Sequence, residues 1–216
     1  MILLALFASL LAAPADCVAG TAGAACRAVA ASNAGKPETA AAEFEAVAAA
    51  AQGAERDRAL AAAGNMWIAA GQPGKAALAL DQALAGGGLQ GPQRGEALLD
   101  RARAAEAQND LRLARARLTE AAALAGEDPF LWYFSAALAI REGDPARAKV
   151  AIGKALALAP DEALVLFEAG HVYHFAGELD KARDYWTRAA AAEPVSPTGK
   201  AAREALALLD APAAPK

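Results

Sequence analysis

EALVLFEAGHVYHFAGELDKARDYWTRAAAAEP, residues 162–194, consists of two largely apolar segments separated by a glycine turn. After the turn residue Gly177, Ala182 follows five residues later, Trp186 four residues after that, and Ala189 three residues further on. Spacings of four and seven place these three side chains on one face of a helix, with a large side chain between two small ones. The stretch therefore predicts a helix, a tight turn and a second, closely packed helix.

The same four positions recur in five places along the chain, and the turn residues follow one another at steps of 36, 38, 34 and 34 residues. The last position is alanine in four units and valine in the first. The five sets are Gly35, Ala40, Phe44 and Val47; Gly71, Ala76, Leu80 and Ala83; Asn109, Ala114, Leu118 and Ala121; Gly143, Ala148, Ile152 and Ala155; and Gly177, Ala182, Trp186 and Ala189. The chain is thus predicted to repeat one helix pair.

Prolines and glycines support this interpretation. Pro37, Pro73 and Pro145 each follow their turn residue by two positions, where the first turn of a helix tolerates a missing N–H. Gly64 and Gly170 lie inside the upstream helices, where each costs about 1 kcal/mol of helix propensity relative to alanine. We infer that another helix comes too close at these two glycines for a side chain to fit.

These units resemble the tetratricopeptide repeat (TPR) family, whose signature alternates small and bulky residues at fixed positions. The matching residues are Leu60, Gly64, Trp67, Leu80 and Ala83 in the second unit; Leu98, Ala102, Leu118 and Ala121 in the third; Trp132, Ala136, Ala148, Ile152, Ala155 and Pro160 in the fourth; and Leu166, Gly170, Tyr173, Ala182, Trp186, Ala189 and Pro194 in the fifth. The first unit matches least well, since Ala24, Ala28 and Ala31 supply no bulk. The resemblance implies an all-α, right-handed α-solenoid of about five TPR-like units with a C-terminal capping helix.

Composition agrees with an all-α fold and excludes several classes. Of the 216 residues, 56% are hydrophobic, so the chain is neither disordered nor a small disulfide scaffold. Much of the apolar fraction is alanine, the best helix former. A net charge of −4 without a basic cluster disfavours a nucleic-acid partner, because phosphate binding requires a surface of lysine and arginine.

The chain is predicted to divide into six segments. Residues 1–15 form a signal peptide, 16–84 the first two repeats, 85–95 a glycine-rich loop, 96–196 repeats three to five, 197–210 the capping helix and 211–216 a disordered tail. The loop is either a hinge between two subdomains or a tolerated surface insertion.

Residues 1–15 read MILLALFASLLAAPA, a short apolar run that ends in Ala13 and Ala15, the small residues that signal peptidase accepts. We expect an exported protein, in the bacterial periplasm, with no stable membrane span after cleavage, because the run is shorter than the roughly 20 residues that cross a bilayer. The segment lacks the usual lysine or arginine near its start. An uncleaved anchor and a cytosolic N-terminal helix therefore stay open.

Cys17 and Cys26 are the only cysteines. In an oxidising compartment they can form a disulfide that ties the mature N-terminus to the first helix. The alternative is a pair of free thiols; a catalytic thiol is disfavoured because no CxxC motif is present.

No catalytic motif was found, so we expect no enzymatic activity and no cofactor. The serines lack a GxSxG context, and none of the Gly-Lys pairs has the upstream glycine of a phosphate-binding loop. His171 and His174 share one helical face and could supply half of a metal site, but they have no evident third ligand. Structural roles and contact with a partner are the other interpretations of this pair.

In the TPR family, the first helices of the repeats line a concave groove. The resemblance carries this role over to Arg58 and Asn65; Leu99, Arg103 and Glu106; Phe130, Tyr133, Ala137, Ile140 and Arg141; and Leu164, Phe167, His171, His174 and Phe175. Aromatic rings beside arginines are typical of binding hot spots. The same aromatic side chains could instead pack between helices and never meet a partner.

The sequence thus favours a non-catalytic scaffold that binds a protein or peptide segment in its groove. One alternative is an accessory or assembly subunit of a cell-envelope complex that uses its outer surface. The other is a metal- or small-ligand-binding protein centred on His171 and His174.

Overall fold

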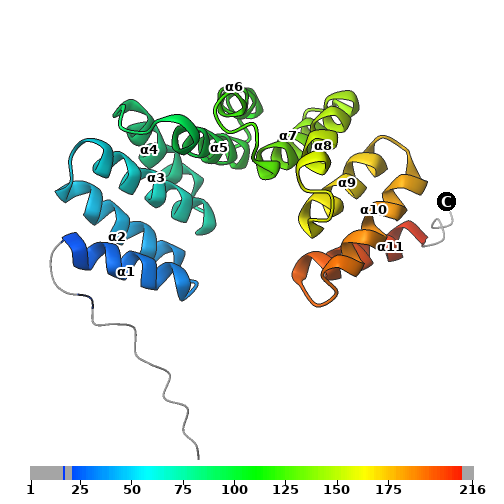
Figure 1. Cartoon of the computed structure of the whole chain (residues 1–216), viewed down its shortest axis with the longest axis horizontal. Coiled ribbons are helices and arrows are strands. Elements are labelled where there is room, and N and C mark those ends of the chain that lie inside the picture. Colours follow the sequence, from blue (N-terminus) through cyan, green and yellow to red (C-terminus); the bar gives the residue numbers. More distant parts are fainter. Residues whose placement is uncertain (1–16, 18–20, 211–216) are drawn as a thin grey trace, which may run out of the picture. The chain divides into compact units, whose positions relative to one another are not determined.

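The computed structural model describes Cys17 and residues 21–210, and the expectations for residues 1–15 and 211–216 lie outside these residues. Eleven helices and no strands make up the described part (Figure 1). They are α1 (Thr21–Asn33), α2 (Pro37–Ala50), α3 (Gly53–Ala69), α4 (Pro73–Ala85), α5 (Gly91–Ala107), α6 (Leu111–Ala122), α7 (Pro129–Arg141), α8 (Pro145–Leu158), α9 (Ala163–Phe175), α10 (Leu179–Ala192) and α11 (Pro197–Asp210). The predicted all-α class is confirmed.

The chain divides into two compact units, and the division falls after Gly88. In the N-terminal unit, α1, α2 and α3 each pack on the next helix along the chain. In the C-terminal unit, α5 to α10 do the same, and α7 also contacts α9. The final helix, α11, packs on α10 and α9. Each odd-numbered helix from α1 to α9 thus pairs with the next one, which gives the five helix pairs expected from the repeat.

All five turn residues adopt positive φ angles: Gly35 66°, Gly71 67°, Asn109 63°, Gly143 75° and Gly177 77°. In every turn, the N–H of the next residue donates to the carbonyl oxygen five residues earlier, at 2.8–2.9 Å. This bond satisfies a carbonyl that the end of the helix leaves unpaired, and it needs a left-handed residue before it. The turns are therefore the same structure repeated five times, and Asn109 takes the place of glycine in the third.

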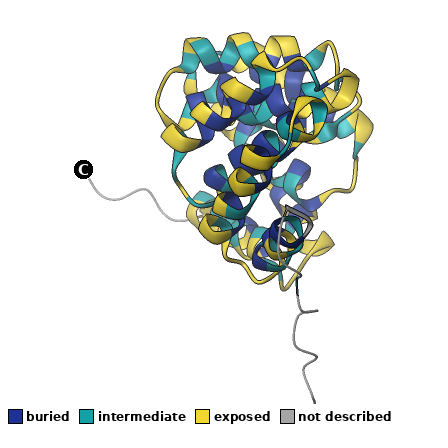
Figure 2. Cartoon of the chain, turned by 90° about the vertical axis from the view of Figure 1, so that its left-hand side faces the viewer, coloured by how far each residue is buried: buried dark blue, intermediate teal, exposed yellow. Residues whose placement is uncertain are grey.

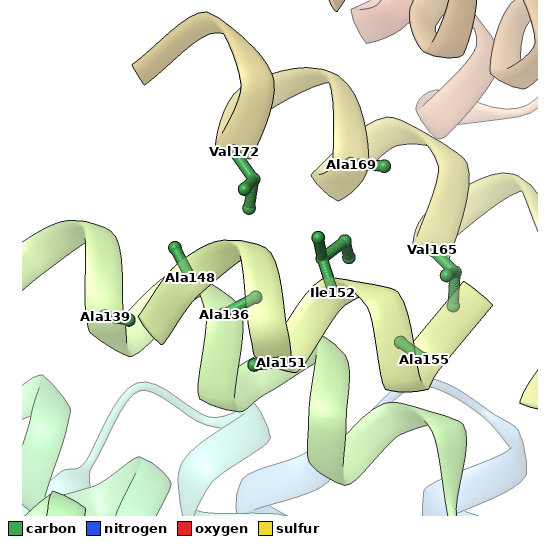
Figure 3. Packing of buried hydrophobic residues seen from close by; sticks show 9 residues of the cluster. All are labelled: Ala136, Ala139, Ala148, Ala151, Ile152, Ala155, Val165, Ala169 and Val172. Atoms are coloured by element: carbon green, nitrogen blue, oxygen red, sulfur yellow. The ribbon is translucent and has the colours of Figure 1, made fainter. Parts of the chain in front are cut away.

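Each helix pair buries its predicted stripe. In the fourth unit, Ala148, Ile152 and Ala155 have no exposed surface, and Ile152 points from α8 toward α9, where Ala169 and Val172 lie (Figure 3). Figure 2 shows the general rule: buried and exposed residues alternate along each helix, so that one face is inside. Because most residues in these stripes are alanines, the helices pack at close range.

Phe44 is the exception among the five large stripe residues, since it is only half-buried. The preceding helix α1, on which α2 packs, buries only the small Ala24, Ala28 and Ala31 among its described side chains. Alanines offer little apolar surface to enclose a phenyl ring, which accounts for the partial exposure of Phe44.

The two mid-helix glycines lie where helices approach closely, as the sequence predicts. A Cβ built on Gly170 would overlap the indole ring of Trp186, and one built on Gly64 would overlap the side chain of Leu80. In both units, the glycine of the first helix thus makes room for the large stripe residue of the second.

We expect Gly170→Ala to lower the free energy of unfolding by about 1–2 kcal/mol. Overpacking a core costs about 1–3 kcal/mol, and the rigid indole places this site near the upper end, while alanine regains about 1 kcal/mol of helix propensity. Gly153→Ala is the matched control, because a Cβ there meets nothing within 4 Å and should stabilise α8. Urea unfolding of both variants tests this, and a Gly170→Ala variant as stable as the wild type would contradict the close approach.

The glycine-rich loop is shorter than predicted. The sequence predicts a loop over residues 85–95, but α4 ends at Ala85 and α5 already begins at Gly91. Pro92 does not prevent this, because the first turn of a helix needs no N–H from it. The glycines serve packing instead: the N–H of Gly88 donates to Oδ2 of the buried Asp57 at 2.8 Å, and a Cβ on Gly86 would overlap that carboxylate.

Cys17 and Cys26 are joined by a disulfide, which links the chain before α1 to that helix. This disulfide excludes both a pair of free thiols and a catalytic thiol. In the described part of the chain, no helix has the length and apolar character needed to cross a membrane.

Candidate functional site

A cavity of about 620 Å³ lies between the first helices of the fourth and fifth units. Ala137, Ile140 and Arg141 of α7 and Glu168, His171, His174 and Phe175 of α9 line it. We call it the α7–α9 cavity. Both helices belong to the C-terminal unit and contact one another directly, so the cavity is part of one compact body.

The structure brings together five of the nine residues predicted for the groove. Ile140, Arg141, His171, His174 and Phe175 line the α7–α9 cavity, whereas Arg103, Phe130, Tyr133 and Phe167 do not. Arg141, His174 and Phe175 are the exposed side chains of its lining, with 41% of Phe175 accessible. A partner that entered the cavity would therefore meet these three side chains first.

Arg141 is already engaged within the protein. Its guanidinium pairs with the carboxylate of Glu106 and donates to Oδ1 of Asn109 at 2.9 Å. These contacts join the end of α7 to the end of α5 and to the turn that follows it. Arg141 thus ties neighbouring repeats together, and its charge is neutralised at the rim of the cavity.

Phe167 and His171 pack against Trp186. The rings of Phe167 and His171 meet edge to face with centroids 4.5 Å apart, and His171 lies 5.3 Å from the Trp186 ring. The indole N–H of Trp186 also donates to the carbonyl oxygen of Phe167 at 3.1 Å. Burial, together with the nearby His174, lowers the pKa of His171, so its imidazole is neutral at pH 7. Phe167 belongs more to the core of the fifth unit than to the groove.

The remaining predicted groove residues, Arg103, Phe130 and Tyr133, belong to α5 and α7. Phe130 is exposed at the start of α7 and its ring meets that of Tyr133 edge to face, with centroids 6.5 Å apart. Tyr133 packs on the core of the fourth unit, and its pKa is raised by burial and then by the charge of Glu168. Arg103 forms an ion pair at 2.9 Å with Asp100 on its own helix.

Glu168 is the cavity residue that the sequence analysis missed. Only 9% of it is exposed, and this burial raises the pKa of its carboxyl to about 8. It lies one turn before His171 on α9, at a position that the TPR resemblance does not assign to the groove. A lone acidic residue within the apolar segment ALVLFEAGHVYHF was the signal that could have revealed it.

The residues given structural roles occupy the interior. Gly64, Trp67, Ala148, Gly170, Ala182 and Trp186 are buried, and Trp132 and Tyr173 are half-buried. The tryptophans and Tyr173 also bear cationic or aromatic neighbours: Lys75 lies over Trp67, Lys154 over Trp132, and Tyr185 stacks on Tyr173. These contacts hold the second helix on the first in the second, fourth and fifth pairs.

The histidine pair does not extend to a metal site. Among the residues that the structure describes, no three His, Cys, Asp or Glu side chains come together to hold an ion. Two imidazoles are too few for a protein zinc site, which usually has at least three protein ligands.

A second cavity, of about 250 Å³, opens on the side of the second helices. It is lined by α6, α7 and α8, and Val150, with 64% of its surface exposed, stands beside it. Arg115 closes one end, where it pairs with Glu142 at 2.7 Å and donates to the hydroxyl of Ser135 at 3.0 Å. This outer cavity is smaller than the α7–α9 cavity.

No protein-family model and no curated protein matches this sequence. Solved structures match it over most of its length. PilW, described as a widely conserved type IV pilus biogenesis factor, is 18% identical with a TM-score of 0.70, over 84% of this chain and 82% of PilW. MamA is 18% identical with a TM-score of 0.61, over 90% of this chain and 98% of MamA.

YrrB, described as a TPR protein with an unusual peptide-binding site, is 19% identical with a TM-score of 0.58, over 86% of this chain and 92% of YrrB. Identities this low establish the fold and nothing finer. Together with the five repeated helix pairs and their identical turns, these similarities show that the chain has the tetratricopeptide-repeat fold.

Proposed function

We propose that this protein is a non-catalytic interaction scaffold that binds a peptide or protein segment in the α7–α9 cavity. The observation that carries the proposal is the cavity itself: about 620 Å³, built by the first helices of two consecutive repeats, with Phe175 exposed at its mouth. This volume lies within the roughly 300–1,000 Å³ that is usual for ligand sites. The likeness to YrrB, a TPR protein with a peptide-binding site, supports the proposal.

The lining suits a segment that inserts one side chain. Ala137, Ile140 and Phe175 offer apolar contact, and an exposed aromatic ring is the usual anchor of a binding hot spot. Because α7 and α9 are held by a buried core on their other faces, the cavity is formed before the partner arrives. Such preorganisation lowers the entropic cost of binding.

A second candidate is an accessory or assembly subunit that docks through its outer surface. The exposed Val150 beside the outer cavity favours it, as does the likeness to PilW, which is described as a pilus biogenesis factor. Both candidate functions include export to an oxidising compartment such as the periplasm. The disulfide between Cys17 and Cys26 supports such export.

Two variants separate these candidates. His174→Ala/Phe175→Ala removes the exposed rings of the α7–α9 cavity, and Val150→Ala trims the outer surface; all three residues are exposed, so both variants should fold. We expect partners captured from a cell-envelope extract to be retained by Val150→Ala and lost by the double variant, with affinity about tenfold or more weaker.

Mass spectrometry of the captured proteins, with circular dichroism to confirm folding, gives the readout. Loss of partners from Val150→Ala with retention by the double variant would contradict groove binding and establish the outer surface as the binding site.

A further inference from the structure

Glu168 stands out in the α7–α9 cavity because it is buried without compensation. It lines the cavity with nine-tenths of its surface covered, and no hydrogen bond or opposite charge in the described part of the chain offsets that burial. A buried carboxyl group is unfavourable unless it is paired. A group of this kind in the lining of a cavity points to a ligand that supplies the missing partner.

The other polar groups of the cavity do not supply it. Arg141 is neutralised by Glu106 and Asn109, and the lowered pKa of His171 leaves its imidazole uncharged at pH 7. His174 is exposed at the mouth, and no charged side chain of α8, α10 or α11 is among the residues that line the cavity. The remaining walls, Ala137, Ile140 and Phe175, are apolar.

We propose that the α7–α9 cavity receives a lysine or arginine side chain of the partner segment, whose cationic end pairs with the carboxylate of Glu168. This proposal rests on the proposed function and names the chemistry that the partner presents. The methylenes of such a side chain would lie along Ile140 and Phe175, as long cationic side chains do on apolar surfaces. The Phe175 ring adds a cation–π attraction.

The burial of Glu168 favours a long cationic side chain as the ligand. Among the lining residues, Phe175 and His174 are exposed whereas Glu168 is only 9% exposed, so the carboxyl is recessed relative to the two rings. A three- or four-carbon side chain reaches a recessed carboxyl more readily than a peptide backbone that rests on the exposed rings. An acidic side chain or a C-terminal carboxylate would find no free cation in the cavity, because the guanidinium of Arg141 is paired with Glu106.

Binding of a cation should displace the proton that Glu168 carries in the free protein. Free Glu168 is mostly protonated at pH 7, and pairing favours the ionised form, so affinity should rise about tenfold between pH 7 and pH 8.5. His171 and His174 on α9 and Tyr133 and Arg141 on α7 also face this region. The contribution of these residues to the pH dependence of binding is measured separately, because it remains when Glu168 is replaced by glutamine.

The test is a selection of random twelve-residue peptides by display on the full chain, on Glu168→Gln and on Glu204→Gln. Glu204 is exposed on α11 and provides the matched loss of one charge. We expect the wild type and Glu204→Gln to enrich peptides that share one lysine or arginine, and Glu168→Gln to lose that preference. For a selected peptide, lysine→norleucine should weaken binding to the wild type by about tenfold to a hundredfold, and should not change binding to Glu168→Gln.

Other results are equally decisive. Enriched peptides without a shared cation, with acidic residues, or with the same cation preference in Glu168→Gln would overturn the cation proposal and leave peptide binding in place. A selection that enriches no peptide on the folded wild type would overturn both this proposal and the proposed function.

Discussion

Trp186→Ala should lower the free energy of unfolding by about 3–5 kcal/mol, the usual cost of removing a large aromatic side chain from a core. Trp186 is 3% exposed and lies between Ala182 and Ala189 on the stripe of α10. Its indole fills the space that Gly170 leaves open, and its N–H donates to the carbonyl oxygen of Phe167. The variant would therefore create a cavity and remove that hydrogen bond.

Urea unfolding followed by far-ultraviolet circular dichroism measures this loss. Val195→Ala is the control, because Val195 is 86% exposed and should change stability little. An unchanged midpoint in Trp186→Ala would show that the indole is not the residue on which the fifth repeat packs.

Glu168→Gln should change how stability depends on pH. Burial raises the pKa of Glu168 from its ordinary 4.5 to about 8, so the folded chain keeps a proton that the unfolded chain releases. The stabilisation of the protonated form is complete below pH 4.5 and is lost as pH rises through about 8. At about 1.4 kcal/mol per pKa unit, the wild type should lose about 3–5 kcal/mol relative to Glu168→Gln between pH 5 and pH 8.5.

Urea unfolding at several pH values, with Glu204→Gln as the control, gives this difference directly. Curves for the wild type and Glu168→Gln that stay parallel over the whole range would mean that Glu168 is solvated or paired in the folded protein.

The sequence predicted the repeating framework correctly because that framework is local. A turn residue, a small residue and a large one at fixed spacing are sufficient to specify a helix pair, and all five turn residues adopt the positive φ that the pattern requires. The close approach of Trp186 to Gly170 could also be predicted from the sequence, because both residues occupy fixed positions of one repeat. Phe44 shows the limit: its burial depends on the bulk of another helix, which periodicity alone does not report.

Only part of the candidate site could be predicted, because it too depends on contacts between helices of different repeats. Position within the repeat identified Ile140, His171 and Phe175, but it also assigned Phe167 to the groove, although Phe167 packs against Trp186. Arg141 was also assigned to the groove, yet its guanidinium is paired with Glu106 of the preceding repeat. Contacts between units depend on how the repeats stack, and the pattern within one repeat does not contain that information.

Nuclear magnetic resonance titration of the isotope-labelled chain with a selected peptide tests the central claim most directly, because it maps the binding surface residue by residue. The account predicts that the backbone amides of α7 and α9 shift most, with the largest changes near Ile140, Glu168 and Phe175, and that His174→Ala/Phe175→Ala abolishes them. Shifts concentrated on α6 and α8 around Val150 would contradict it and move the binding site to the outer surface.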